Sequence, residues 1–364
     1  MSDSVAEHIA ALHDADWGIR EDAALALGTL GDPRGISPLI QALNDSDRAV
    51  RQAAISSLTK LGQAAVEPLG MALEDPNLIV QESAASILVH IADHRVVDPL
   101  MTALLSPNWI VRMYAAQALG RLTVPQAIDT LILLLQDKVK AVRDAAITAL
   151  QAMREQAVPR LLDTLAHQDW SVRLRTVEAL AILKPRTAVP ALLDRLHQEP
   201  DTAVRQDIIR ALGEIGDASA VRPLLALLHD PRVKTQVIDA LGKLGDPAPI
   251  PALIDIVQDL TPQDYEDRVS ACTDRRYQEE LPVAIAAVHA LARLGVPDTL
   301  PVLIQALRLT PIRSEAAKAL ILFGKAAVPS LIQMLKTEQD ENIRYHVKET
   351  LAQLGWRPGQ IRLA

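Results

Sequence analysis

Aromatic residues and cysteine are scarce in this chain of 364 residues. Aromatics make up 2% of it, with a single Phe, and Cys272 is the only cysteine. One cysteine excludes an internal disulfide and a cysteine-rich zinc or iron–sulphur site. Strands and α/β cores need more aromatic and β-branched mass than this. The abundance of alanine and leucine therefore indicates closely packed helices.

A basic surface and long apolar runs are also missing. The formal net charge is −8, which argues against a binder of nucleic acids or anionic membranes, because both need a basic face. The apolar run LILLL at 131–135 is far too short to span a bilayer. The first residues, MSDSVAEHIA, lack the basic and apolar regions of a signal peptide. These features predict a soluble cytoplasmic protein with no membrane span and no nucleic-acid partner.

One pattern recurs along nearly the whole chain: Val or Ile, then usually Arg, then Leu seven residues after the Arg. The spacing between copies is 29–32 residues, apart from one gap of 50 residues. Such self-similarity is the mark of a repeat protein. The eleven central positions are Arg20, Arg51, Gln81, Arg112, Arg143, Arg173, Arg205, Lys234, Ala284, Arg313 and Arg344.

Each copy predicts a hairpin of two helices. Around the arginine, apolar residues follow a helical stripe, and alanines on it let a neighbouring helix approach closely. An Asp or Asn four residues earlier, such as Asp16, is placed to cap this arginine-type helix, and a glycine often ends it. The other helix begins near a proline such as Pro38, which a first turn tolerates. We call it the proline-type helix.

Eleven such hairpins predict an all-α fold, an α-solenoid of about eleven two-helix repeats, because one hairpin cannot bury its apolar stripes alone. We expect one continuous solenoid, with the first proline-type helix at about 4–13 and the last arginine-type helix at about 341–354. Residues 1–258 would hold repeats 1–8 and the first helix of repeat 9. Residues 259–280 would form a charged insertion within repeat 9. Residues 281–364 would hold its second helix, repeats 10 and 11 and a C-terminal tail.

Two copies, DWGIREDAALALGTLGDPRGISPLIQAL at 16–43 and DTAVRQDIIRALGEIGDASAVRPLLALL at 201–228, resemble the HEAT-like repeat of the phycobilisome-lyase type. The resemblance implies that the arginine-type helices line a concave face. It also implies a hydrogen-bonded ladder between the Asp and Arg residues of successive units. Because the opposite charges recur together, we interpret the ladder as structural. Its implied members are Asp16, Arg20, Asp47, Arg51, Asp169, Arg173, Asp201, Arg205, Asp340 and Arg344.

Three of the four tryptophans directly follow a capping residue, in repeats 1, 4 and 6. On the resemblance, this position opens onto the concave face. Close by, repeats 4 and 6 carry apolar residues where several other copies are polar. The mixture is typical of the centre of a protein interface; the alternative is that each tryptophan covers a helix junction. The predicted partner-binding patch contains Trp17, Trp109, Met113, Tyr114, Trp170, Leu174 and Arg175.

The insertion at 259–280 is a possible second contact with a partner. Long loops in compact repeats are often functional, although a charged segment can equally be a solvated insertion. The candidate residues here are Tyr265, Cys272, Arg275, Arg276 and Tyr277.

No catalytic or metal-binding constellation stands out. Several histidines close proline-type helices, but adjacent repeats would hold them roughly 10 Å apart, too far to share a zinc ion. The motifs of phosphate-binding loops, nucleophile elbows and zinc proteases do not occur. We therefore predict no catalytic residue, no metal and no cofactor.

The leading hypothesis is a non-catalytic scaffold or adaptor that binds another protein on its concave face, in the assembly or maturation of a cyanobacterial complex. The resemblance leaves two alternatives. The first is an E/F-type phycobilin lyase or bilin chaperone acting on a phycobiliprotein. Its bilin propionates would bind Arg112, Arg121, Arg173 and Arg175. The second is a helper of an A-type iron–sulphur carrier, with Cys272 completing a cluster held by the partner's thiolates.

Overall fold

The computed structural model describes residues 3–259 and 275–356, with the backbone alone for 275–279. The regular secondary structure in these ranges is entirely helical, and the helices form eleven successive hairpins, which confirms the predicted α-solenoid. The chain divides into two compact units, Met1–Ala179 and Leu180–Ala364. The division falls inside one helix, α12 (Trp170–Leu183), and was not predicted.

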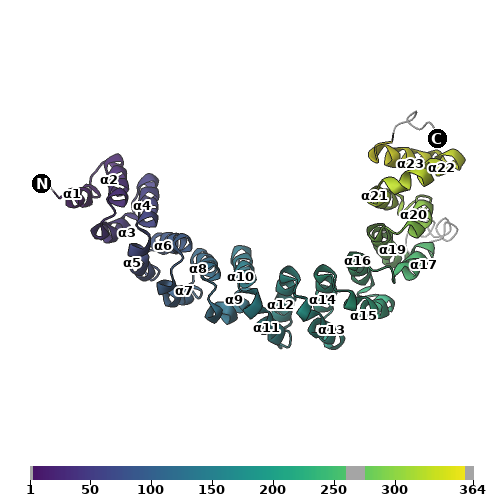
Figure 1. The fold of residues 1–364 in the computed structure, drawn as a ribbon, viewed down its shortest axis with the longest axis horizontal. Coiled ribbons are helices and arrows are strands. Elements are labelled where there is room, and N and C mark those ends of the chain that lie inside the picture. The colour runs from purple at the N-terminus through teal and green to yellow at the C-terminus, as the bar shows by residue number, and fades with distance from the viewer. Residues whose placement is uncertain (1–2, 260–274, 357–364) are drawn as a thin grey trace. The chain divides into compact units, whose positions relative to one another are not determined.

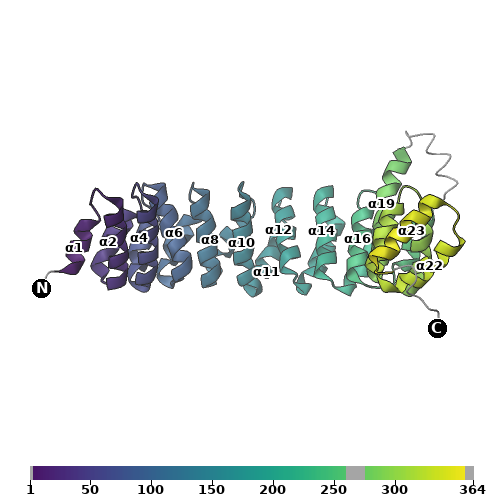
Figure 2. The same cartoon turned by 90° about the horizontal axis from the view of Figure 1, so that it is seen from above.

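The N-terminal unit has two layers of helices. In Figures 1 and 2 its arginine-type helices lie side by side in one layer, and the proline-type helices form the other. The proline-type helices are α1 (Ser4–Ala11), α3 (Ile36–Ala42), α5 (Val66–Ala72), α7 (Val97–Ala103), α9 (Ile128–Leu134) and α11 (Arg154–Thr164). The arginine-type helices are α2 (Trp17–Leu30), α4 (Arg48–Leu61), α6 (Leu78–Ile91), α8 (Trp109–Leu122), α10 (Lys140–Ala152) and the start of α12.

The C-terminal unit continues the alternation. It contains α13 (Val189–Gln198), α14 (Thr202–Ile215), α15 (Val221–Ala226), α16 (Lys234–Leu244), α17 (Ile250–Gln258), α19 (Arg275–Leu294), α20 (Leu300–Ala306), α21 (Arg313–Phe323), α22 (Val328–Thr337) and α23 (Glu341–Gln353). Helix α19 begins at Arg275, earlier than the predicted end of the insertion at residue 280.

The core of each unit lies between its two layers. The leucine seven residues after the arginine is fully buried in all eleven copies, from Leu27 to Leu351. Glycines bring neighbouring arginine-type helices together. A Cβ added to Gly120 of α8 would lie 2.6 Å from the Cα of Ala149 in α10, and one added to Gly28 would lie 2.4 Å from the Cβ of Ser57. These helices therefore pack almost backbone to backbone.

Left-handed residues end many of the arginine-type helices. Gly31, Gly216 and Gly245 close α2, α14 and α16 with φ between 70° and 75°, as the sequence predicted. Ala92 and Thr123 close α6 and α8 with φ of 49° and 52°. A residue with a side chain is strained in this conformation by roughly 1–2 kcal/mol.

Replacing Ala92 with glycine should therefore stabilise the chain. We expect the free energy of unfolding to rise by about 0.5–1 kcal/mol, since relief of strain exceeds the larger unfolded entropy of glycine. Ala26→Gly, in the interior of α2, is the control and should lower it by a similar amount. Denaturant unfolding followed by circular dichroism measures both; equal signs for the two variants would contradict the assignment of strain to Ala92.

No single helix in the described ranges has the length and apolar composition to cross a membrane. One pair, Arg313–Phe323 and Lys325–Thr337, reaches that length and composition only when taken together, and it is bent by 112° at the break.

Candidate protein-binding surface

The arginine of most repeats binds carbonyl groups in the turn between the two helices of its hairpin. Arg20 Nη1 donates to the carbonyls of Asp14 (2.9 Å) and Ala15 (3.2 Å). Arg51 does the same in the next repeat, to Asp45 and Ser46. These carbonyls lie beyond the last residue of the preceding helix, so the guanidinium fastens the connecting turn to the start of the arginine-type helix. The contact recurs at Arg112, Arg143, Arg173, Arg313 and Arg344.

Some of the repeat arginines also reach a carboxylate in the following repeat. Arg20 binds Asp45 through Nε (2.7 Å) and Nη2 (2.8 Å), with both side chains only 12% exposed. The hydrogen bonds from Arg20 lower the pKa of Asp45 below its ordinary value. The other pairs are Arg112–Asp137 and Arg205–Asp230. These bonds fasten successive repeats within a unit.

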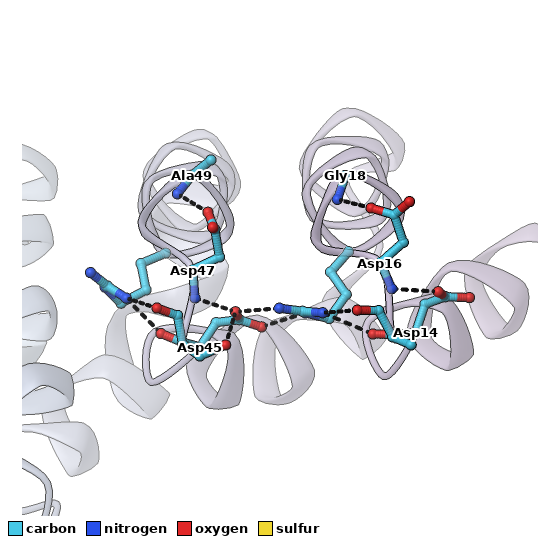
Figure 3. Close-up of polar contacts among 10 residues, drawn as sticks. Asp14, Asp16, Gly18, Asp45, Asp47 and Ala49 are labelled. Carbon is cyan, nitrogen blue, oxygen red and sulfur yellow. Dashed lines mark hydrogen bonds and ion pairs between the residues drawn. The ribbon is translucent and has the colours of Figure 1, made fainter.

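The aspartates that bind the ladder arginines are not the ones predicted from the sequence. Asp16 and Asp47 are helix caps, whose carboxylates accept from the N–H groups of Gly18 (2.8 Å) and Ala49 (2.7 Å), as Figure 3 shows. The ladder acid, Asp45, lies two residues before Asp47 and also accepts from its N–H. A capping carboxylate is already occupied by its own helix, so the arginine binds the acid in the turn instead. Asp169, Asp201 and Asp340 are helix caps as well.

The first residues of the arginine-type helices in the N-terminal unit form a row, which we call the N1 row. Helices in one layer with the same repeat position at their start place these residues along one edge. The four apolar members are 40–53% exposed, and both basic members are exposed. The N1 row consists of Trp17, Arg48, Leu78, Trp109, Lys140 and Trp170.

Leu78 was missed by the sequence analysis, which looked for tryptophan. It follows the capping residue Asn77 as each tryptophan follows its own cap, and that position was the available signal. It is 53% exposed, and the adjacent Ile79 is 45% exposed. Repeats 3 and 4 thus carry neighbouring apolar members of the row, Leu78 and Trp109.

Other predicted patch residues lie one helical turn behind the tryptophans. Met113 and Leu174 follow Trp109 and Trp170 by four residues, so each pair shares a helix face; Met113, Tyr114 and Leu174 are all half-buried. Arg175 instead donates to both carboxylate oxygens of Glu178, at 2.9 and 2.7 Å. Its charge is thereby neutralised within its own helix.

Some charged groups around the N1 row already form hydrogen bonds or ion pairs, and others do not. Lys140 donates to Asp144, one turn along α10. Glu82 accepts from the side-chain amide of Asn108 at 2.7 Å, across α6 and α8. Arg48 makes no ion pair within the described ranges. Helix α10 begins after Val139, so it has no side-chain cap.

Three of the four arginines proposed to bind a bilin already donate hydrogen bonds to groups of the protein itself. Arg112 binds Asp137 and two carbonyls, and Arg173, only 5% exposed, binds the carbonyls of His167 and Gln168. Arg175 is held by Glu178. The set assigned from the sequence is therefore reduced to Arg121, which is exposed near the end of α8.

The predicted second contact is only partly visible. Tyr265 and Cys272 lie outside the described residues. Arg275, Arg276 and Tyr277 form the start of α19, where the backbone alone is described. Their part in binding stays a prediction. Over the described ranges, no group of three or more His, Cys, Asp or Glu side chains is arranged to hold a metal ion.

Comparison with known proteins places the chain in a family. A sequence profile of HEAT repeats matches residues 5–88, 66–151, 129–206, 189–271 and 276–352. The chain is 44% identical over 59 residues to the bilin biosynthesis protein PecE of Mastigocladus laminosus, covering 16% of this chain and 22% of PecE. It is 38% identical over 65 residues to PecE of Nostoc sp., covering 18% and 26%. It thus spans about a quarter of the length of these relatives.

A solved structure shows the same fold. Kap121p, bound to the extreme C-terminus of the protein phosphatase Cdc14p, superposes with a TM-score of 0.63 at 14% identity. The match covers 96% of this chain and 45% of Kap121p. The chain belongs to the HEAT-repeat family, and its similarity to PecE supports the phycobilisome-lyase type of repeat that its motif predicted.

Proposed function

We propose that the chain is a non-catalytic scaffold that binds another protein along the N1 row. The observation that carries this proposal is the row itself: Trp17, Leu78, Trp109 and Trp170 begin arginine-type helices and remain 40–53% exposed. Tryptophan supplies much of the binding energy at protein interfaces. A set of large apolar side chains in one repeated position is typical of such an interface.

The packing of the layer favours a protein partner. Neighbouring helices lie about 10 Å apart, so six of them present a row on the order of 50 Å long, which suits a polypeptide. The ladder and the close glycine contacts fix the helices before binding, so little ordering entropy is lost when a partner docks. Kap121p, which shares the fold, holds a segment of another protein. The similarity to PecE supports a role in assembly or maturation of a cyanobacterial pigment–protein complex.

Trp109→Ala combined with Trp170→Ala should strongly weaken binding of the partner. We expect at least about a 30-fold loss of affinity, because a buried hot-spot residue contributes about 2 kcal/mol or more. The partner would be captured from an extract of the native host with the full chain, and its affinity measured by isothermal titration.

The matched control is Met71→Ala with Leu133→Ala. These side chains are 75% and 63% exposed on the proline-type helices α5 and α9. The control should bind as the unmodified chain does. Equal affinity of the tryptophan variant and the control, with circular dichroism unchanged, would refute binding along the N1 row.

A bilin lyase or bilin chaperone is the second candidate, because the stretches shared with PecE are 38–44% identical. Exposed Arg121 is the remaining arginine of the proposed set that no contact within the described ranges occupies. An open-chain bilin mixed with the chain should then show an absorbance shift that Arg121→Ala reduces. An unchanged spectrum, with or without a phycobiliprotein subunit, would remove this candidate.

A further inference from the structure

We propose that the partner segment covering the N1 row is a stretch of polypeptide that combines apolar side chains with acidic ones. This inference rests on the proposed function and adds the chemistry of the partner. The order of side chains along the row is Trp17, Arg48, Leu78, Trp109, Lys140, Trp170. Each cation therefore stands between two exposed apolar side chains, and none of the six residues is acidic.

The charge of the row favours acidic partner residues. Arg48 is exposed and forms no ion pair within the described ranges. Lys140 pairs with Asp144, but the two side chains are 77% and 55% exposed, and such a surface pair is weak enough for a partner carboxylate to share the lysine. A basic segment would instead meet two like charges. Charge complementarity of this kind raises association rates and excludes wrong partners.

The acidic groups near the middle of the N1 row do not cancel its preference for acidic partner residues. Glu82 is held by Asn108, whereas Asp144 shares Lys140 with any carboxylate that the partner brings. The caps of repeats 3, 4 and 5 are uncharged: Asn77, Asn108 and Val139. The caps Asp47 and Asp169, beside Arg48 and Trp170, accept hydrogen bonds from their own helices, and repeat 1 adds Glu21 and Asp22 after Trp17. The acidic partner residue is therefore expected beside Lys140, between Trp109 and Trp170.

The spacing of the helices sets the spacing in the partner. A step of about 10 Å between helices equals about three residues of an extended chain or about seven residues of a helix. The partner should therefore carry an apolar residue that contacts Trp109, then an acid that binds Lys140, then an apolar residue that contacts Trp170. Successive residues of this set should be separated by one of these two intervals.

Selection from a displayed library of random 20-residue peptides on the full chain tests the inference. We expect peptides of net negative charge with apolar residues at one of these intervals. Their affinity should fall about 10-fold for Arg48→Glu with Lys140→Glu, and it should weaken as salt rises. Lys60→Glu with Arg95→Glu makes the same change of charge near the other ends of α4 and α6, and should alter affinity less than twofold.

The outcomes separate this inference from the proposed function. Peptides that need Trp109 and Trp170 but are neutral or basic, or ignore the Arg48 and Lys140 reversals, overturn the acidic partner and leave the binding surface standing. Failure to enrich any peptide that depends on the tryptophan pair contradicts both. Self-association of the chain that requires these tryptophans, seen by sedimentation, would make a second copy the occupant and overturn the inference.

Discussion

Gly120→Val is expected to lower the free energy of unfolding by about 3 kcal/mol, the upper part of the range for overpacked sites. A Cβ at this position would lie 2.6 Å from the Cα and 2.7 Å from the Cβ of Ala149. These atoms belong to the backbone and first side-chain atom of α10, so no rotamer change can make room. Helices α8 and α10 would have to separate, which would loosen the contact between repeats 4 and 5.

The control for this prediction is Gln151→Val. Gln151 holds the same position one repeat later, near the end of α10, but its side chain is exposed. The substitution should change stability by less than about 0.5 kcal/mol. Denaturant titration of both variants measures the difference. Equal unfolding midpoints would mean that the close approach at Gly120 does not hold the repeats together.

Arg112→Gln is expected to lower the free energy of unfolding by about 3 kcal/mol, because it leaves a largely buried carboxylate without its cation. Arg112 binds Asp137 through Nε (2.8 Å) and Nη2 (3.1 Å), and the two side chains are 16% and 7% exposed. Glutamine can still reach a carbonyl, as Gln81 does in repeat 3, where it donates to the carbonyl of Asp75.

Repeat 3 also suggests the matched control. Ser106 follows Gln81 at the same distance in sequence as Asp137 follows Arg112. The fold therefore tolerates neutral residues at both of these positions. The double variant Arg112→Gln with Asp137→Asn should recover part of the lost stability. A double variant that is less stable than Arg112→Gln would contradict the account. Arg48→Gln, which breaks no ion pair within the described ranges, should be nearly neutral.

The same ion pair predicts a dependence on pH. Burial raises the pKa of Asp137, but hydrogen bonds from Arg112 and the N–H of Val139 outweigh it, so the pKa lies below the ordinary 3.8. A carboxyl group of this kind stabilises the fold at pH values above its unfolded pKa. The contribution is lost as the pH falls through the lower, folded pKa. Stability should therefore fall less steeply below pH 4 in Arg112→Gln than in the unmodified chain.

The sequence predicted what depends on local periodicity. The buried leucines, the caps at Asp16 and Asp47, and the glycine at the end of α2 each follow from residues a few positions apart. The ladder acid was misassigned because Arg20 reaches 25 residues ahead to Asp45. Both Asp45 and Asp47 are acids in the same turn, and only the positions of their atoms distinguish the cap from the partner.

The candidate surface was predicted in part for a related reason. Tryptophan is rare enough for three copies in one position to stand out, whereas Leu78 is one of many leucines and its exposure had to be seen. Arg112 and Arg173 looked like available cations in the sequence, yet their donors are used within the fold. Whether a charged side chain already has a partner depends on the positions of groups in the turn before it and in the next repeat, which periodicity does not give.

Photocrosslinking in the native host tests the central claim most directly. A benzophenone amino acid would replace Trp109 in one variant and Met71, on the other layer, in a second. Binding along the N1 row predicts a crosslinked partner from position 109, absent at position 71 and lost when Trp170→Ala is added. A partner crosslinked from position 71 and not from position 109 would contradict the account.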